Sequence, residues 1–71
     1  MNSADGGAAL ESLLAQGDGY AGKGDVKAAT SFYQAALKAA QSRAVDPMTH
    51  ARLGDAASYI RQQAETYKAA L

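Results

Sequence analysis

The segment that most constrains the fold of this chain is the glycine-punctuated stretch 17–37, GDGYAGKGDVKAATSFYQAAL. At its centre, Gly22-Lys23-Gly24-Asp25 separates two runs with helical spacing of apolar residues. A glycine just past a helix can adopt the left-handed conformation that ends it, and an aspartate can accept a backbone N–H as the N-cap of the next helix. Because so short a connection makes two helices lie antiparallel, the stretch predicts a helical hairpin.

Both arms of the predicted hairpin carry one apolar face. We expect the first helix to run from about Ala8 to the break at Gly22, and the second from about Val26 to Arg43. The face of the first helix consists of Leu10, Leu13, Leu14, Gly17, Tyr20 and Ala21. The face of the second consists of Val26, Ala29, Tyr33, Ala36, Leu37 and Ala40. Each interior glycine costs roughly 0.5 to 1 kcal/mol relative to alanine, so the first helix depends on packing.

A third helix is predicted after Asp46-Pro47, because proline suits the first helical position and aspartate the cap before it. Its apolar seam has a period near 3.5 residues and consists of Leu53, Ala57, Ile60, Ala64, Tyr67 and Leu71. The predicted fold is therefore all-α, a three-helix antiparallel bundle in which a packing or capping helix follows a helix-turn-helix. Residues 1–7 are expected to form a flexible leader, and residues 8–71 a single domain.

Composition excludes several classes of function. The chain has 71 residues, no cysteine and one histidine, so it offers neither a disulfide framework nor the usual ligands of a zinc site. Seven Lys and Arg balance seven Asp and Glu, which argues against a nucleic-acid partner. No signal peptide or membrane-spanning run is visible. We expect a cytoplasmic protein without cofactor, metal or membrane insertion.

The glycines also match a G-x-G-x-x-G pattern and come close to a phosphate-binding loop. Such loops need a preceding strand, whereas residues 10–16 have helical spacing. His50 has no second histidine or cysteine to act with and is expected at the surface, while Asp25 and Asp46 are explained as caps. No catalytic set is visible, and we expect that the protein is not an enzyme.

The spacing of small and aromatic residues resembles that of a tetratricopeptide (TPR) repeat, a helical hairpin of about 34 residues. The matching positions are Gly17, Tyr20, Gly24, Asp25, Ala29, Tyr33, Ala36 and Leu37. Leu13, Gln16 and Gln41 depart from the pattern, which has tryptophan, leucine and proline there. A weaker resemblance, to the three-helix MIT domain, rests on Tyr59-Ile60 and Ala64-Glu65.

The TPR resemblance implies a module that binds a peptide or helix of a partner protein. The partner-facing side of the first helix would then carry Glu11, Leu14, Asp18, Ala21 and Gly22. Phe32 and Tyr59 lie off the main apolar stripes and are further candidates for partner binding. Two alternatives stay open. The first is self-association or helix stacking through the Leu53–Leu71 seam, which would give a homo-oligomer, and the second is an MIT-like trafficking adaptor.

Overall fold

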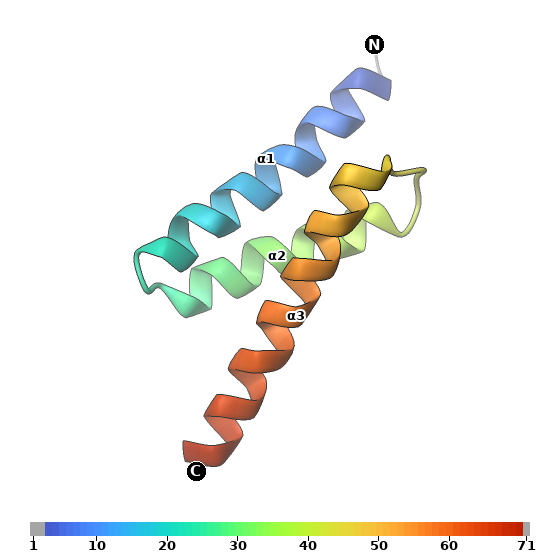
Figure 1. Cartoon of the computed structure of the whole chain (residues 1–71). Helices are drawn as coiled ribbons and strands as arrows, with labels where there is room; N and C mark the ends of the chain where they lie inside the picture. The colour runs from blue at the N-terminus through green and yellow to red at the C-terminus, as the bar shows by residue number, and fades with distance from the viewer. Residues whose placement is uncertain (1–2, 71) are drawn as a thin grey trace.

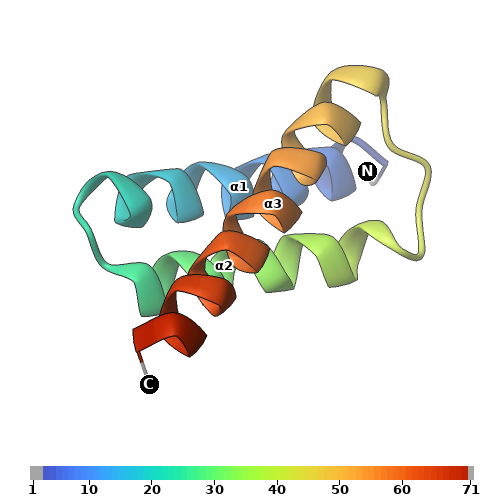
Figure 2. The ribbon, with the colours of Figure 1, turned by 60° about the horizontal axis from the view of Figure 1, so that its bottom comes forward.

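The structure, a computed structural model, describes residues 3–70 and consists of three helices (Figure 1). They are α1 (Ser3–Gly22), α2 (Val26–Ala40) and α3 (Pro47–Ala70). α1 and α2 form an antiparallel hairpin, and α3 packs chiefly on α2 and crosses the hairpin obliquely (Figure 2). This part of the chain contains no strand. The predicted all-α, three-helix bundle is confirmed.

Two helix boundaries differ from those predicted. α1 begins at Ser3, so residues 3–7, which the sequence assigned to a flexible leader, continue the helix. Extending an existing helix costs far less than nucleating one, which allows glycines 6 and 7 to be included. Met1 and Asn2 of the predicted leader lie outside the described residues. α2 ends at Ala40 instead of Arg43, because the Gln41 N–H donates to the Lys38 carbonyl, three residues back, and the last turn tightens into the connection.

The turn between α1 and α2 follows the predicted chemistry. Gly24 has a φ of 82°, the left-handed conformation that favours glycine. The N–H groups of Gly24 and Asp25 donate to the carbonyls of Ala21 and Tyr20, at 3.1 and 2.9 Å, in a Schellman-type helix end. The Asp25 carboxylate then accepts the N–H of Ala28 at 3.2 Å and caps α2. This turn therefore satisfies backbone groups at both helix ends.

The third helix also starts as predicted, at a proline preceded by a capping aspartate. The Asp46 carboxylate accepts the Thr49 N–H at 3.2 Å, and the His50 N–H donates to the Asp46 carbonyl at 2.9 Å. Hydrogen bonding from Thr49, first from its side chain and then from its backbone, lowers the pKa of the Asp46 carboxyl from 3.8. The charged form of Asp46 therefore stabilises the start of α3.

A small core joins the three helices. Its buried hydrophobic residues are Leu10, Leu14, Ala29, Tyr33, Ala36, Leu53 and Ala56. Val26, predicted to face the core, is 40% exposed because it occupies the first helical position beside the turn. In α3 the buried face passes through Ala56, while Ala57 is half-buried and Ala64 is exposed. The side chain of Tyr67, and Leu71 as a whole, lie outside the described part of the seam.

Gly17 allows α1 and α2 to approach closely at the centre of the hairpin. A Cβ atom added there would lie 2.5 and 2.6 Å from two ring carbons of Tyr33. Real Cβ atoms do not approach other atoms so closely, so only glycine leaves room for this ring. The glycine in the middle of α1 is thus a packing requirement.

α3 is long relative to the hairpin on which it packs. At about 1.5 Å per residue, its 24 residues span about 36 Å, whereas the 15 residues of α2 span about 22 Å. The molecule measures 46 × 19 × 17 Å, and the C-terminal end of α3 extends past the hairpin (Figure 1). Part of α3 therefore has no neighbouring helix among residues 3–70.

Candidate functional site

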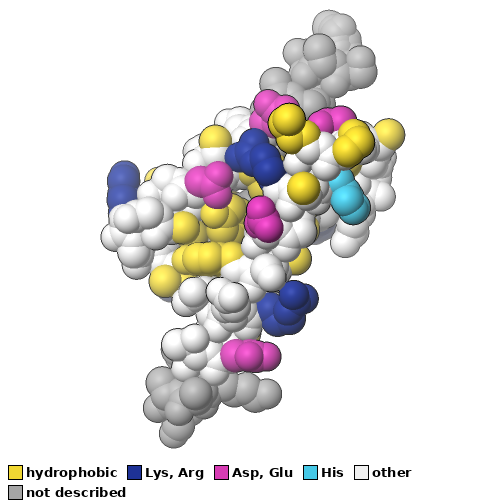
Figure 3. All heavy atoms as spheres, in the orientation of Figure 1, with side chains coloured by type: hydrophobic (Ala, Val, Ile, Leu, Met, Phe, Trp, Pro, Cys, Tyr) yellow, Lys and Arg dark blue, Asp and Glu magenta, His cyan; other side chains and the backbone are white. Residues whose placement is uncertain are grey.

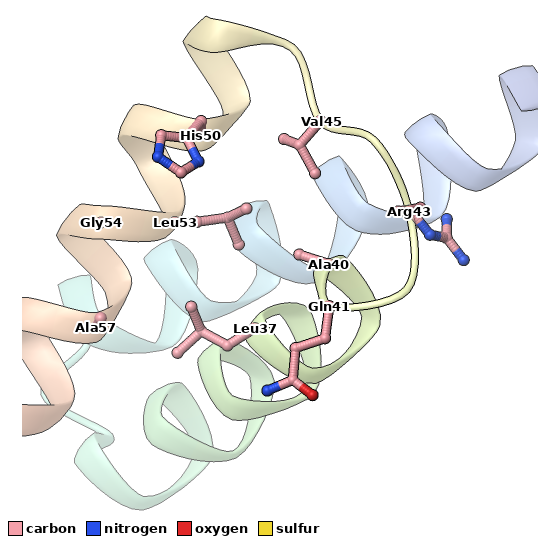
Figure 4. A pocket seen from close by; sticks show the side chains of 9 residues that line it. All are labelled: Leu37, Ala40, Gln41, Arg43, Val45, His50, Leu53, Gly54 and Ala57. Atoms are coloured by element: carbon pink, nitrogen blue, oxygen red, sulfur yellow. The ribbon is translucent and has the colours of Figure 1, made fainter.

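An apolar hollow lies where the end of α2, the connection 41–46 and the first half of α3 meet (Figure 4). We call it the α2–α3 groove, and its volume is about 440 Å³. Its lining residues are Leu37, Ala40, Gln41, Arg43, Val45, His50, Leu53, Gly54 and Ala57.

The floor of the α2–α3 groove is built from aliphatic side chains of three separate segments. Leu37 comes from α2, Val45 from the connection and Leu53 from α3, and their side chains converge in Figure 4. Leu53 is only 6% exposed, while Leu37 and Val45 are half-buried. The floor is therefore fixed by the core beneath it and retains apolar surface that faces outward.

Gly54 forms an open wall of this groove. A Cβ atom added at Gly54 would meet nothing within 4 Å, in contrast to Gly17, where it would meet the Tyr33 ring. Packing within the described part of the chain therefore does not require a glycine at position 54. A glycine inside a helix is costly relative to alanine, and here it leaves the backbone of α3 accessible from the groove.

The edge of the groove is cationic. Arg43 and His50 are its charged or titratable lining residues, and both are exposed. Figure 4 shows the Arg43 side chain on the connection, directed away from the apolar floor. Arg61 follows the lining residue Ala57 by four residues, so the two lie on the same face of α3. The Arg61 side chain is exposed. The chain is neutral overall, but positive groups border this groove.

A second, smaller hollow of about 260 Å³ is polar and joins all three helices. We call it the polar pocket, and it is lined by Leu14, Asp18, Tyr33, Arg52, Asp55, Ala56 and Tyr59. The Tyr33 hydroxyl donates to Oδ1 of Asp18 at 2.5 Å, and Nη2 of Arg52 donates to Oδ2 of the same carboxylate at 3.3 Å. The Tyr59 ring meets the Tyr33 ring edge-on at 5.2 Å between centroids.

The polar pocket is explained by packing between the helices. Burial, followed by the hydrogen bond to Asp18, raises the pKa of Tyr33 from 10.0 to about 12. Tyr33 therefore remains a neutral donor across the physiological range. The hydrogen bonds of Asp18 to Tyr33 and Arg52 connect α1 to α2 and α3, which holds the helices in register.

The structure brings together three of the seven partner-binding residues predicted from the sequence. Leu14, Asp18 and Tyr59 all line the polar pocket. Leu14, however, is 1% exposed and is a core residue, because it points from α1 into the contact between the helices. It offers a partner no surface.

The other four predicted residues lie outside both hollows. Glu11 is exposed on α1, Gly22 is exposed at its end, and Ala21 is half-buried against the core. Phe32 is half-buried and stacks on Tyr20 with 5.4 Å between ring centroids.

Hydrophobic side chains also gather in the angle between α1 and α3 on the face shown in Figure 3, where charged side chains border them. In the polar pocket, the aromatic rings of Tyr33 and Tyr59 contact each other, and the Tyr33 hydroxyl donates a hydrogen bond to Asp18. Of the two hollows described above, the α2–α3 groove is the larger and the more apolar. The sequence placed Leu37 and Leu53 on core-facing stripes and assigned no role to Val45. Gly54, a helix-interior glycine to which the sequence analysis assigned no role, is the signal that could have indicated the groove.

Two features that would indicate other classes of function are absent from residues 3–70. Among residues 3–70, no helix is both long and apolar enough to cross a lipid bilayer. Within the same residues, no three acidic or histidine side chains are grouped so as to hold a metal ion.

Comparisons of the chain with models of protein families, with curated proteins and with solved structures find no match.

Proposed function

We propose that this protein is a non-enzymatic protein-interaction module that binds a helical segment of a partner protein in the α2–α3 groove. The observation that carries the proposal is the outward-facing apolar floor of Leu37, Val45 and Leu53 beside the open backbone at Gly54. An amphipathic helix can bury its apolar face in a groove of this kind.

The shape of the groove suits a helix better than a small molecule. It is open along α3, and Ala40, Gly54 and Ala57 keep its walls low. Small side chains at such positions let a second backbone approach closely, so that its larger side chains reach the aliphatic floor. The spacing that resembles TPR repeats supports the same class of function, since such hairpins bury their open faces against neighbouring helices.

Selection from a displayed library of amphipathic helical peptides, followed by calorimetry on the enriched peptides, tests the proposal. Gly54→Leu fills the open wall of the groove and raises the helix propensity of α3, so it should abolish binding without loss of fold. Gly19→Leu is the matched control, because Gly19 also has free space around it and lies on α1, away from the groove.

Comparing the two variants distinguishes a blocked groove from a general effect of a leucine substitution on the protein. The proposal requires that Gly54→Leu weakens binding at least tenfold and that Gly19→Leu binds like the parent. Equal binding by both variants would show that the peptides occupy another surface, and the proposal would fail.

Self-association is a second candidate, favoured by the length of α3. Ile60 is half-buried where α3 leaves the hairpin, and the following residues 64–66 are exposed. A second copy could cover this part of α3 by pairing along the seam. Sedimentation equilibrium over a wide concentration range decides the matter: a monomer at all concentrations contradicts self-association.

A further inference from the structure

We infer that the segment bound in the α2–α3 groove is acidic, with carboxylates on both flanks of its apolar face. This inference rests on the proposed function and adds the chemistry of the partner. It follows from how charge is distributed on either side of the groove.

Positive groups stand at separate points around the apolar floor. Arg43 lies on the connection at one side, and Arg61 lies one turn beyond the groove on the helix face that lines it. A helix lying along α3 would therefore pass cations at both of its flanks. Acidic side chains there would gain attraction, and basic ones would be repelled.

Among the described residues, no carboxylate forms an ion pair with Arg43 or Arg61, and the exposed Glu65 lies one turn beyond Arg61 on α3. No lining residue of the groove is acidic. Asp46, next to Val45 in the chain, already accepts the Thr49 N–H as the cap of α3. Asp18 and Asp55 line the polar pocket, and the Arg52 guanidinium that pairs with Asp18 also belongs there. Arg43 and Arg61 are thus exposed cations without an ion pair among the described residues, and Nη2 of Arg61 also donates to the Ser58 hydroxyl at 3.5 Å.

Three synthetic helical peptides of about four turns test the inference. They share one Leu and Ala face and carry Glu, Gln or Lys on its flanks. Exposed ion pairs each change affinity by a factor of about 1.4 to 5, so the Glu peptide should bind roughly tenfold tighter than the Gln peptide at low salt. The Lys peptide should bind most weakly, and added salt should reduce the differences.

Charge reversal at the edge provides the decisive comparison. In the double variant Arg43→Glu and Arg61→Glu, the order of the three peptides should invert. The control double variant Lys23→Glu and Lys27→Glu changes net charge equally, but at the other end of the hairpin, and should keep the original order.

The outcomes separate the two proposals. If the Gln and Glu peptides bind the groove equally, or the control variant inverts the order as well, the acidic partner is contradicted and the groove function stands. If none of the peptides binds, or Gly54→Leu affects none of them, the proposed function fails and the inference fails with it.

Discussion

Replacing Gly17 by alanine tests whether close contact with Tyr33 holds the hairpin together. The new methyl group would lie 2.5 Å from one ring carbon of Tyr33 and 2.6 Å from the next. The ring has little freedom to move, because its hydroxyl is bonded to Asp18 and its edge contacts Tyr59. The two helices would have to separate, or the ring would have to leave its site.

The expected magnitude combines two opposing effects. Alanine gains about 0.5 to 1 kcal/mol over glycine in a helix interior. Overpacking a buried site costs about 1 to 3 kcal/mol. Gly17→Ala should therefore lower the free energy of unfolding by up to about 2.5 kcal/mol. Gly19→Ala, with free space around the new methyl group, should raise it by about 0.5 to 1 kcal/mol.

Thermal and urea unfolding followed by circular dichroism measures this difference. The two variants differ by the overpacking cost of about 1 to 3 kcal/mol, and 1 kcal/mol corresponds to about 4 to 8 °C in Tm for a domain of this size, so they should melt roughly 4 to 24 °C apart. If Gly17→Ala is as stable as Gly19→Ala, the ring of Tyr33 does not lie against α1, and the packing described for the hairpin is incorrect.

Three further predictions follow from burial and titration. Leu14→Ala should cost about 2 to 5 kcal/mol, whereas Met48→Ala, at a 77% exposed side chain, should stay within about 0.5 kcal/mol; urea unfolding that finds equal effects would contradict the assigned core. Because the folded pKa of Tyr33 is raised to about 12, its contribution to stability is present below pH 10.0 and is lost as pH rises toward 12; the ultraviolet titration should show a late step that Tyr33→Phe removes. Because the pKa of Asp46 is lowered in the folded state, its charged carboxylate stabilises the fold above pH 3.8, and this contribution is lost as the pH falls through the folded pKa. The Tm of the parent should therefore exceed that of Asp46→Asn by less in acid than at neutral pH. A difference in Tm that does not change with pH would refute the charged cap.

Local chemistry made the helix ends predictable. The positive φ of Gly24 and the caps at Asp25 and Asp46 depend on a few neighbouring residues, so the sequence locates them without knowledge of the tertiary fold. The start of α1 is different. Ser3 precedes the expected start because the helix extends through residues whose own propensities are weak.

The orientation of α3 could not be read from the pattern. Ala56 and Ala57 are adjacent in sequence, about 100° apart around the helix, and equal in hydrophobicity, so periodicity cannot choose between them. In the structure Ala56 is buried and Ala57 lines the groove, because the connection 41–46 determines the position at which α3 packs on α2. Leu13 and Leu14 pose the same problem on α1, and the buried one is Leu14.

The candidate site was hidden for the same reason. Leu37 and Leu53 belong to apolar stripes, and a stripe alone does not show how much of it another helix covers. Only the placement of α3 reveals that their outer edges, together with Val45, remain open. By contrast, the polar pocket formed around Asp18 and Tyr59, two residues that the sequence singled out for a partner, and it serves contacts between helices.

Methyl and amide NMR spectra of the domain, titrated with a peptide enriched in the selection, test the central claim most directly. The account predicts that the largest shifts occur at the methyl groups of Leu37, Val45 and Leu53, with little change at Leu10 and Leu14. Gly54→Leu should abolish these shifts. Saturable shifts confined to α1 or to the polar pocket, with Leu37, Val45 and Leu53 unchanged, would contradict binding in the α2–α3 groove.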